Sequence, residues 1–233
     1  KLKILFFMVS LEDILENIDL FEKDFGYVYS PGFEAIYFSK EGMELFLRNK
    51  GEINRMIELC KKYNNEEIYS EDLDNAGFKL IDEGFEGSVY SVFIGKEKFA
   101  LKVYHTDMNT EVGRTYFEDL LRTENEGIFE TVHPYIAGEG FLLMELIPED
   151  YIDFDDFVKE FPDLAIKARN EVLRMQRGLN LEDAGHLFDV DFESQFDEDE
   201  LDEEDYESNP KHVYVNNVEG KLKYLIIDMG YDF

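Results

Sequence analysis

The feature that most constrains the fold is the stretch Gly77–His105, which reads GFKLIDEGFEGSVYSVFIGKEKFALKVYH. It is rich in strand-forming residues and contains two turn signals, the glycine pair Gly84 and Gly87 and the dipeptide Gly95-Lys96. The pattern predicts two strands joined by a glycine-bearing turn and then a third strand after a hairpin. The stretch therefore favours an antiparallel sheet.

The third predicted strand has one lysine inside an apolar run, Phe99-Ala100-Leu101-Lys102-Val103. An unpaired ammonium group is costly to bury, so Lys102 needs a partner. A bound phosphate together with a carboxylate would supply one, and Gly84 and Gly87 would let backbone N–H groups approach the same phosphates. The spacing therefore indicates a phosphate site. The alternative is an ordinary surface meander with a lysine at its edge.

These residues carry a family resemblance. The segment from Asp82 to Tyr90, DEGFEGSVY, resembles the glycine-rich loop of protein kinases, with Asp82 in place of the first glycine. The run Phe99–Lys102 resembles the kinase strand that carries the ATP-contacting lysine. The resemblance implies ATP as a ligand, with nucleotide contacts from Gly84, Gly87, Val89, Ala100 and Lys102.

The next segments extend the resemblance. Residues 114–131 have helical spacing, and in kinases the corresponding helix presents a glutamate to the lysine. Glu124 and Glu126 are both candidates, and matching His133-Pro134 to the usual kinase His-Pro favours Glu124. Solvent-exposed helix charges are the alternative interpretation.

A second predicted hairpin follows and ends in the apolar run FLLMELIP, residues 141–148. It resembles the kinase strand and hinge, which implies adenine hydrogen bonds to the backbone from Glu145 to Ile147, with Met144 behind the base. Residues 153–158 and 163–179 are predicted helices that match the first two helices of a kinase C-terminal lobe.

The chain then carries a candidate metal ligand. Residues 212–227 predict a hairpin, and Asp228-Met229-Gly230 resembles the kinase Asp-Phe-Gly with methionine in the middle. A carboxylate directly after a buried strand suits Mg²⁺ on ATP phosphates, which makes Asp228 a metal ligand in this interpretation. A turn aspartate that caps the hairpin is the alternative.

The expected catalytic loop departs from the family pattern. Asp191, or alternatively Asp189, would be the general base, but no asparagine follows five residues later and residues 193–207 form an acidic insertion. A second alignment places residues 205–207 on the His-Arg-Asp position and His212 on the asparagine, which makes His212 a metal or phosphate ligand. The sequence ends three residues after Gly230, where a typical kinase continues. Truncation, a separate chain or a minimal kinase would each explain this.

Charge and cysteine content limit the partners. The net charge of −31 argues against direct contact with nucleic acid or an anionic membrane, and it permits a basic protein partner. The single cysteine, Cys60, rules out an intrachain disulfide and favours a reducing, cytoplasmic compartment. Cys60 also falls on the apolar stripe of a helix predicted from Glu52 to Tyr63, so a buried structural thiol is expected.

The predicted fold class is α+β, a bilobal protein-kinase-like fold with an antiparallel sheet plus helix in the N-lobe and a reduced helical C-lobe. The expected organisation is a small α+β N-terminal extension over 1–70, a linker over 71–75, an N-lobe over 76–147 and a C-lobe over 148–233. Within the extension, the apolar start predicts a strand rather than a signal peptide, Ser10 begins a helix, and a hairpin surrounds Pro31-Gly32.

The sequence predicts an atypical protein-kinase-like phosphotransferase that uses ATP and Mg²⁺ and acts on Ser/Thr hydroxyls. Two alternatives stay open. One is a non-catalytic pseudokinase that binds a basic protein through its acidic surface, and the other is an acidic nucleic-acid mimic.

Overall fold

The computed structural model describes residues 27–30, 36–84, 87–105, 112–126, 130–138, 140–178, 212–218 and 220–227. The predicted strand and helix within residues 1–26 lie outside these ranges. The chain forms two compact units. The first contains residues 1–117 and 134–144, and the second contains residues 118–133 and 145–233.

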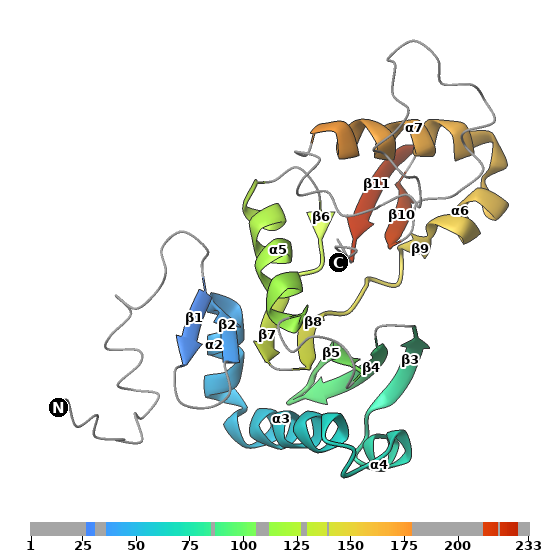
Figure 1. Ribbon diagram of the computed structural model, residues 1–233. Coiled ribbons are helices and arrows are strands. Elements are labelled where there is room, and N and C mark those ends of the chain that lie inside the picture. Colours follow the sequence, from blue (N-terminus) through green and yellow to red (C-terminus); the bar gives the residue numbers. More distant parts are fainter. Residues whose placement is uncertain are drawn as a thin grey trace, which may run out of the picture. The chain divides into compact units, whose positions relative to one another are not determined.

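The first unit is built on a seven-stranded sheet with the strand order β1-β2-β7-β8-β5-β4-β3 (Figure 1). Antiparallel pairing joins β1 to β2, β2 to β7, β7 to β8, β3 to β4 and β4 to β5. The predicted α+β class with an antiparallel sheet is therefore confirmed. The strands are β1 (Tyr27–Ser30), β2 (Ile36–Ser39), β3 (Lys79–Glu83), β4 (Gly87–Ile94), β5 (Glu97–Tyr104), β7 (Pro134–Gly138) and β8 (Phe141–Glu145).

The predicted hairpins are present. Strands β1 and β2, which flank Pro31-Gly32 in the sequence, pair with each other, and β4 pairs with β5 from Gly87↔Tyr104 to Ile94↔Glu97. Gly95 makes the second turn with a φ of 63°, a value that glycine adopts without steric cost. The Gly95 N–H donates to a carboxylate oxygen of Glu52 at 2.6 Å, so this turn is also held by a helix.

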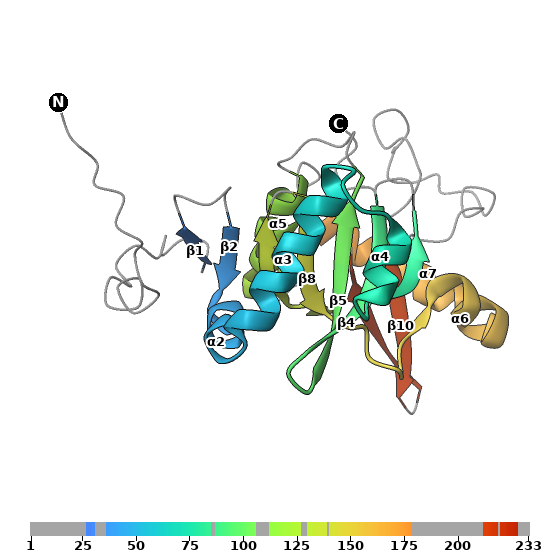
Figure 2. The ribbon, with the colours of Figure 1, turned by 90° about the horizontal axis from the view of Figure 1, so that it is seen from below.

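Helices α2 (Lys40–Arg48), α3 (Lys50–Asn64) and α4 (Ser70–Asn75) follow β2 in the chain. Figure 2 shows α3 and α4 lying across one face of the sheet. The helix predicted from Glu52 to Tyr63 is confirmed as α3, and its buried residues Ile53, Met56, Ile57 and Cys60 pack in one core with side chains of β4, β5 and β8. Residues 36–78 therefore complete the core of the sheet.

The segment predicted as a linker, residues 71–75, is helical instead. It forms most of α4, where a carboxylate oxygen of Asp72 accepts the N–H of Tyr69 at 2.9 Å. The physical reason is Leu73, which is fully buried in the same core and so ties the segment to the sheet. The predicted domain boundaries stay a prediction.

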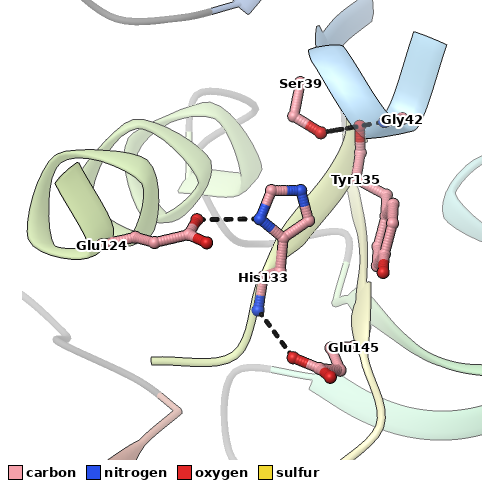
Figure 3. A network of polar contacts seen from close by, with 6 residues as sticks. All are labelled: Ser39, Gly42, Glu124, His133, Tyr135 and Glu145. Carbon is pink, nitrogen blue, oxygen red and sulfur yellow. Dashed lines mark hydrogen bonds and ion pairs between the residues drawn. The ribbon is translucent and has the colours of Figure 1, made fainter. Parts of the chain in front are cut away.

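Helix α2 approaches strand β7 very closely. Ser39 caps the helix by accepting the Gly42 N–H at 3.0 Å, and its hydroxyl donates to the carbonyl oxygen of Tyr135 at 3.4 Å (Figure 3). A Cβ on Gly42 would clash with that same carbonyl oxygen, so only glycine permits this approach.

Helix α5 (Val112–Glu126) contributes to both units, because Phe117 belongs to the first and Glu118 to the second. The sequence predicted helical spacing up to Thr131, but Glu130 and Thr131 form strand β6. The reason is strand pairing, since Thr131 lies beside Ile226 in a parallel ladder.

The second unit combines a four-stranded sheet with two further helices. The sheet has the order β6-β11-β10-β9, and α6 and α7 pack on the β10–β11 hairpin through Phe157, Ala168 and Val172 (Figure 1). The predicted helices and the late hairpin are thereby confirmed. The remaining elements are β9 (Ile152–Asp153), α6 (Phe154–Glu160), α7 (Pro162–Gly178), β10 (Val213–Val218) and β11 (Lys221–Ile226).

Among the residues described, none of the helices has the length and apolar character needed to cross a lipid bilayer.

Candidate functional site

Lys102 lies on the face of strand β5 opposite to the core that α3 and α4 share with the sheet. Alternation along the strand places Leu101 and Val103 on the face that packs against the helices, where both are fully buried. Lys102 points to the opposite face and is half-buried. A partly desolvated ammonium group on a sheet face, between two core residues, is the arrangement that the sequence predicted.

Four of the predicted nucleotide-binding side chains share this face. Val89 lies directly opposite Lys102 in the β4–β5 ladder, and Ala100 precedes Lys102 by one full pleat. On β8, Leu143 belongs to the core cluster, so Met144 lies on the other face of the sheet. The structure thus brings the side chains of Val89, Ala100, Lys102 and Met144 to one side of the first unit. We call these four residues the Lys102 face.

The two predicted phosphate-loop glycines differ in their surroundings. A Cβ on Gly87 would clash with the carbonyl oxygen of Val103 and lie 2.9 Å from the Cα of Tyr104. The sheet itself therefore requires glycine at position 87. Gly84 is exposed, and an added Cβ there would meet only the carbonyl oxygen of Gly87 at 3.8 Å. Packing in the described structure therefore does not require glycine at position 84.

A histidine that the sequence analysis did not select holds this turn. Nε2 of His105 lies 3.2 Å from the carbonyl oxygen of Gly84, and the Gly84 N–H donates to the carbonyl oxygen of Gly87 at 2.9 Å. His105 directly follows β5, so the end of the lysine strand is tied to the tip of the glycine turn. The only sequence signal was its place three residues after Lys102.

The predicted hinge begins with Glu145, whose backbone N–H already donates a hydrogen bond within the protein. It donates to the carbonyl oxygen of His133 at 2.8 Å, because β8 continues its pairing to this point. Leu146 and Ile147 follow in irregular backbone and are half-buried. Within the described part of the chain, their N–H groups have no hydrogen-bond partner. Of the predicted adenine contacts, the Glu145 N–H is therefore engaged, whereas the N–H groups of Leu146 and Ile147 are not engaged by other described residues.

Glu124, predicted to pair with Lys102, interacts with His133. A carboxylate oxygen of Glu124 lies 2.8 Å from Nδ1 of His133, and the His133 N–H donates to a carboxylate oxygen of Glu145 at 3.4 Å. Figure 3 shows the His133 ring directed at Glu124. This cluster joins the end of α5 to the first hinge residue within the second unit. The role of Glu124 toward Lys102 stays a prediction.

His212, a predicted metal ligand, directly precedes β10 and is exposed. Its φ of 58° is uncommon for a residue with a side chain, although histidine adopts it more readily than most. Its carbonyl oxygen accepts the N–H of Ile227 at 3.1 Å, which extends the β10–β11 ladder by one pair. His212 is therefore fixed beside Ile227, the residue before Asp228.

Three predicted features lie outside the described residues. They are the metal ligand Asp228, the general base Asp191 and the acidic insertion 193–207. Among the residues that are described, no three His, Cys, Asp or Glu side chains gather in a way that could hold a metal ion.

Cys60 takes no part in a site. It is completely buried, and burial raises the pKa of its thiol to about 12. Almost no thiolate is then present at pH 8, so we expect an aromatic disulfide reagent to leave the folded protein unmodified at that pH. The same reagent should modify one thiol per chain in denaturant. Rapid modification of the folded protein would contradict the buried, inert thiol.

The sequence and the structure were compared with known proteins. No family model matches the sequence, and no curated protein matches it either. Among solved structures, the chain is similar to the Rio2 kinase of Chaetomium thermophilum, determined as an ADP/Mg²⁺-phosphoaspartate complex, with a TM-score of 0.38 and 14% identity. The match covers 93% of this chain and 61% of that one, so the chain spans less than two thirds of the kinase. A likeness at this level concerns the fold and carries no information about activity.

Proposed function

We propose that the chain is an ATP-dependent phosphotransferase of the protein-kinase type that acts on Ser or Thr hydroxyls. The observation that carries the proposal is the Lys102 face, where a half-buried lysine shares one side of the sheet with Val89, Ala100 and Met144. Three apolar side chains beside one cation suit a ligand with a flat aromatic base and an anionic tail.

In this proposal Lys102 contacts the ATP phosphates, which lie beside the glycine turn that contains Gly84. The N–H groups of Leu146 and Ile147, which have no partner among the described residues, support hydrogen bonding to adenine. His212 and Asp228 would hold Mg²⁺, which spreads the charge of the phosphates during transfer.

The reaction breaks the bond between the γ-phosphorus and the β,γ-bridging oxygen of ATP and forms a bond from that phosphorus to the acceptor oxygen. The proton of the acceptor hydroxyl passes to Asp191, and ADP leaves. The protein contributes mainly positioning and charge neutralisation, because phosphoryl transfer needs little covalent chemistry from side chains.

The proposal is tested by titrating the protein with ATP, with and without Mg²⁺, in thermal unfolding. ATP at a hundred times its dissociation constant should stabilise the fold by about 2.7 kcal/mol, and Asp228→Ala should remove the part that depends on Mg²⁺. Transfer is then followed with γ-labelled ATP and a mixture of Ser/Thr peptides. An unchanged melting temperature together with no transfer would exclude the activity.

The second candidate is a non-catalytic, kinase-like binding module. The charge balance favours it, since 54 acidic residues against 23 basic ones give a net charge of −31 and a surface suited to a basic protein. The same titration separates the two candidates. Stabilisation by ATP without any transfer of label would support the binding module.

A further inference from the structure

The Lys102 ammonium group rests against two aromatic rings. Nζ lies 4.6 Å from the ring centre of Tyr116 and 5.0 Å from that of Tyr104. The two rings stack on each other with centres 5.9 Å apart and planes only 2° from parallel. A cation within about 6 Å of a ring centre is attracted by the negative face of the ring, and here two rings meet that condition.

Three separate elements build this arrangement inside the first unit. Tyr104 follows Lys102 by two residues on β5, so both side chains lie on the same face of the sheet. Tyr116 comes from α5 and is also buried. The backbone N–H of Tyr104 donates to the carbonyl oxygen of Gly140 at 2.9 Å, which fixes the end of β5 against the β7–β8 turn.

A glycine explains how α5 comes close enough. Gly113 is the second residue of this helix, a position where glycine lowers helix stability relative to alanine. A Cβ there would lie 2.8 Å from the carbonyl oxygen of Gly138 and 2.9 Å from that of Phe141, and 3.4 Å from the Tyr104 ring. Tyr116 lies one helical turn further along, so the approach at Gly113 places its ring beside Lys102.

We propose that Tyr104 and Tyr116 form an aromatic cradle that positions the Lys102 ammonium group for an anionic ligand, and that under the proposed function this ligand is the triphosphate of ATP. The chemistry favours rings for this task. An aromatic ring attracts an ammonium group without carrying a formal charge of its own.

The cradle is tested without nucleotide by a double-mutant cycle in urea unfolding, using Tyr116→Leu, Lys102→Leu and the double variant. Leucine replaces the lysine because a methionine sulfur would itself favour the rings. We expect the two positions to be coupled, with the folding equilibrium constant departing from additivity by about threefold to tenfold. Tyr116→Phe keeps the ring face and serves as the matched control, so it should preserve the coupling.

A second measurement changes the charge distribution of the ring at position 116 and keeps the shape of the ring. Pentafluorophenylalanine at position 116 has the shape of the phenylalanine control, but fluorine withdraws electrons from the ring face, so the coupling to Lys102 should disappear. This comparison still measures the coupling if the Tyr116→Leu variant does not fold. Additive behaviour in the cycle, or equal coupling for the plain and fluorinated rings, would overturn the cradle.

Titration with Mg-ATP then tests whether Tyr116 positions Lys102 for the ligand. Tyr116→Leu should weaken binding by about threefold to tenfold, whereas Tyr116→Phe should bind as the unmodified protein does. Equal affinity for the two variants would overturn the positioning role. Coupling in the cycle without any binding of Mg-ATP by the unmodified protein would overturn the proposed function, and with it the triphosphate as the ligand of the cradle.

Discussion

Replacing Lys102 with methionine is expected to reduce phosphoryl transfer by about a hundredfold or more, because a positioned charge that stabilises a transition state contributes on that scale. Methionine keeps the length and apolar stem of the lysine and removes only the charge. The folded state should tolerate it, since Lys102 lies on a sheet face and its fully buried neighbours are unchanged. Initial rates with labelled ATP and a melting curve of the same preparation measure both effects.

The chain provides a matched control for this substitution. Lys98 lies on the same strand and the same side of it, two pleats away from Lys102, and is exposed. Lys98→Met removes the same charge from the protein without touching the Lys102 face, so transfer should continue at the original rate. Retained transfer in Lys102→Met would contradict the proposed nucleotide site, and equal losses in both variants would point to a general charge effect.

Replacing Gly42 with alanine is expected to destabilise the protein by about 3 kcal/mol, the upper range for overpacking a closely packed contact. The added methyl group would collide with the backbone carbonyl of Tyr135, which cannot rotate away as a side-chain end could. Helix α2 would have to shift on strand β7, and the capping bond from Gly42 to Ser39 would be strained with it. The midpoint of urea unfolding measures the loss.

Gly51 is the matched control for Gly42. It also lies in a helix, α3, but a Cβ at this position would meet nothing within 4 Å. Gly51→Ala should therefore stabilise the protein by about 0.5 to 1 kcal/mol, because alanine loses less backbone entropy on folding and favours the helix. A loss of stability in Gly51→Ala comparable to that in Gly42→Ala would show that the contact with Tyr135 is not the cause.

Local pattern was enough to predict most of the elements. The turn at Gly95, the apolar run around Lys102 and the stripe that contains Cys60 depend on neighbours within a few residues, and all three predictions are confirmed. Local pattern could not show that Val89, Ala100, Lys102 and Met144 share one face, because the order of strands in the sheet joins segments that are far apart in the sequence. Only the resemblance to kinases grouped these residues in one predicted site.

The features that the sequence did not predict depend on contacts between residues that are far apart in the chain. Residues 71–75 read as a polar connection, but the burial of Leu73 makes them a helix. Gly87 was predicted to contact a ligand, and packing across the sheet is a second reason for glycine at that position, while the ligand contact stays a prediction. The pairing of Glu124 with His133 joins the end of a helix to a hinge residue, and no spacing rule in the sequence predicts such a contact.

The shared core of residues 36–78 and the sheet has a consequence for how the chain can be divided. A fragment that starts at Gly77 would expose Tyr90, Val92, Phe99 and Leu101 to water, although all four are now buried. Each large apolar side chain gains about 1.5 to 3 kcal/mol from burial, so four of them together match the roughly 5 to 15 kcal/mol that stabilises a whole domain. The segment before the glycine turn is thus an obligatory half of one folding unit, and a fragment that lacks it would aggregate.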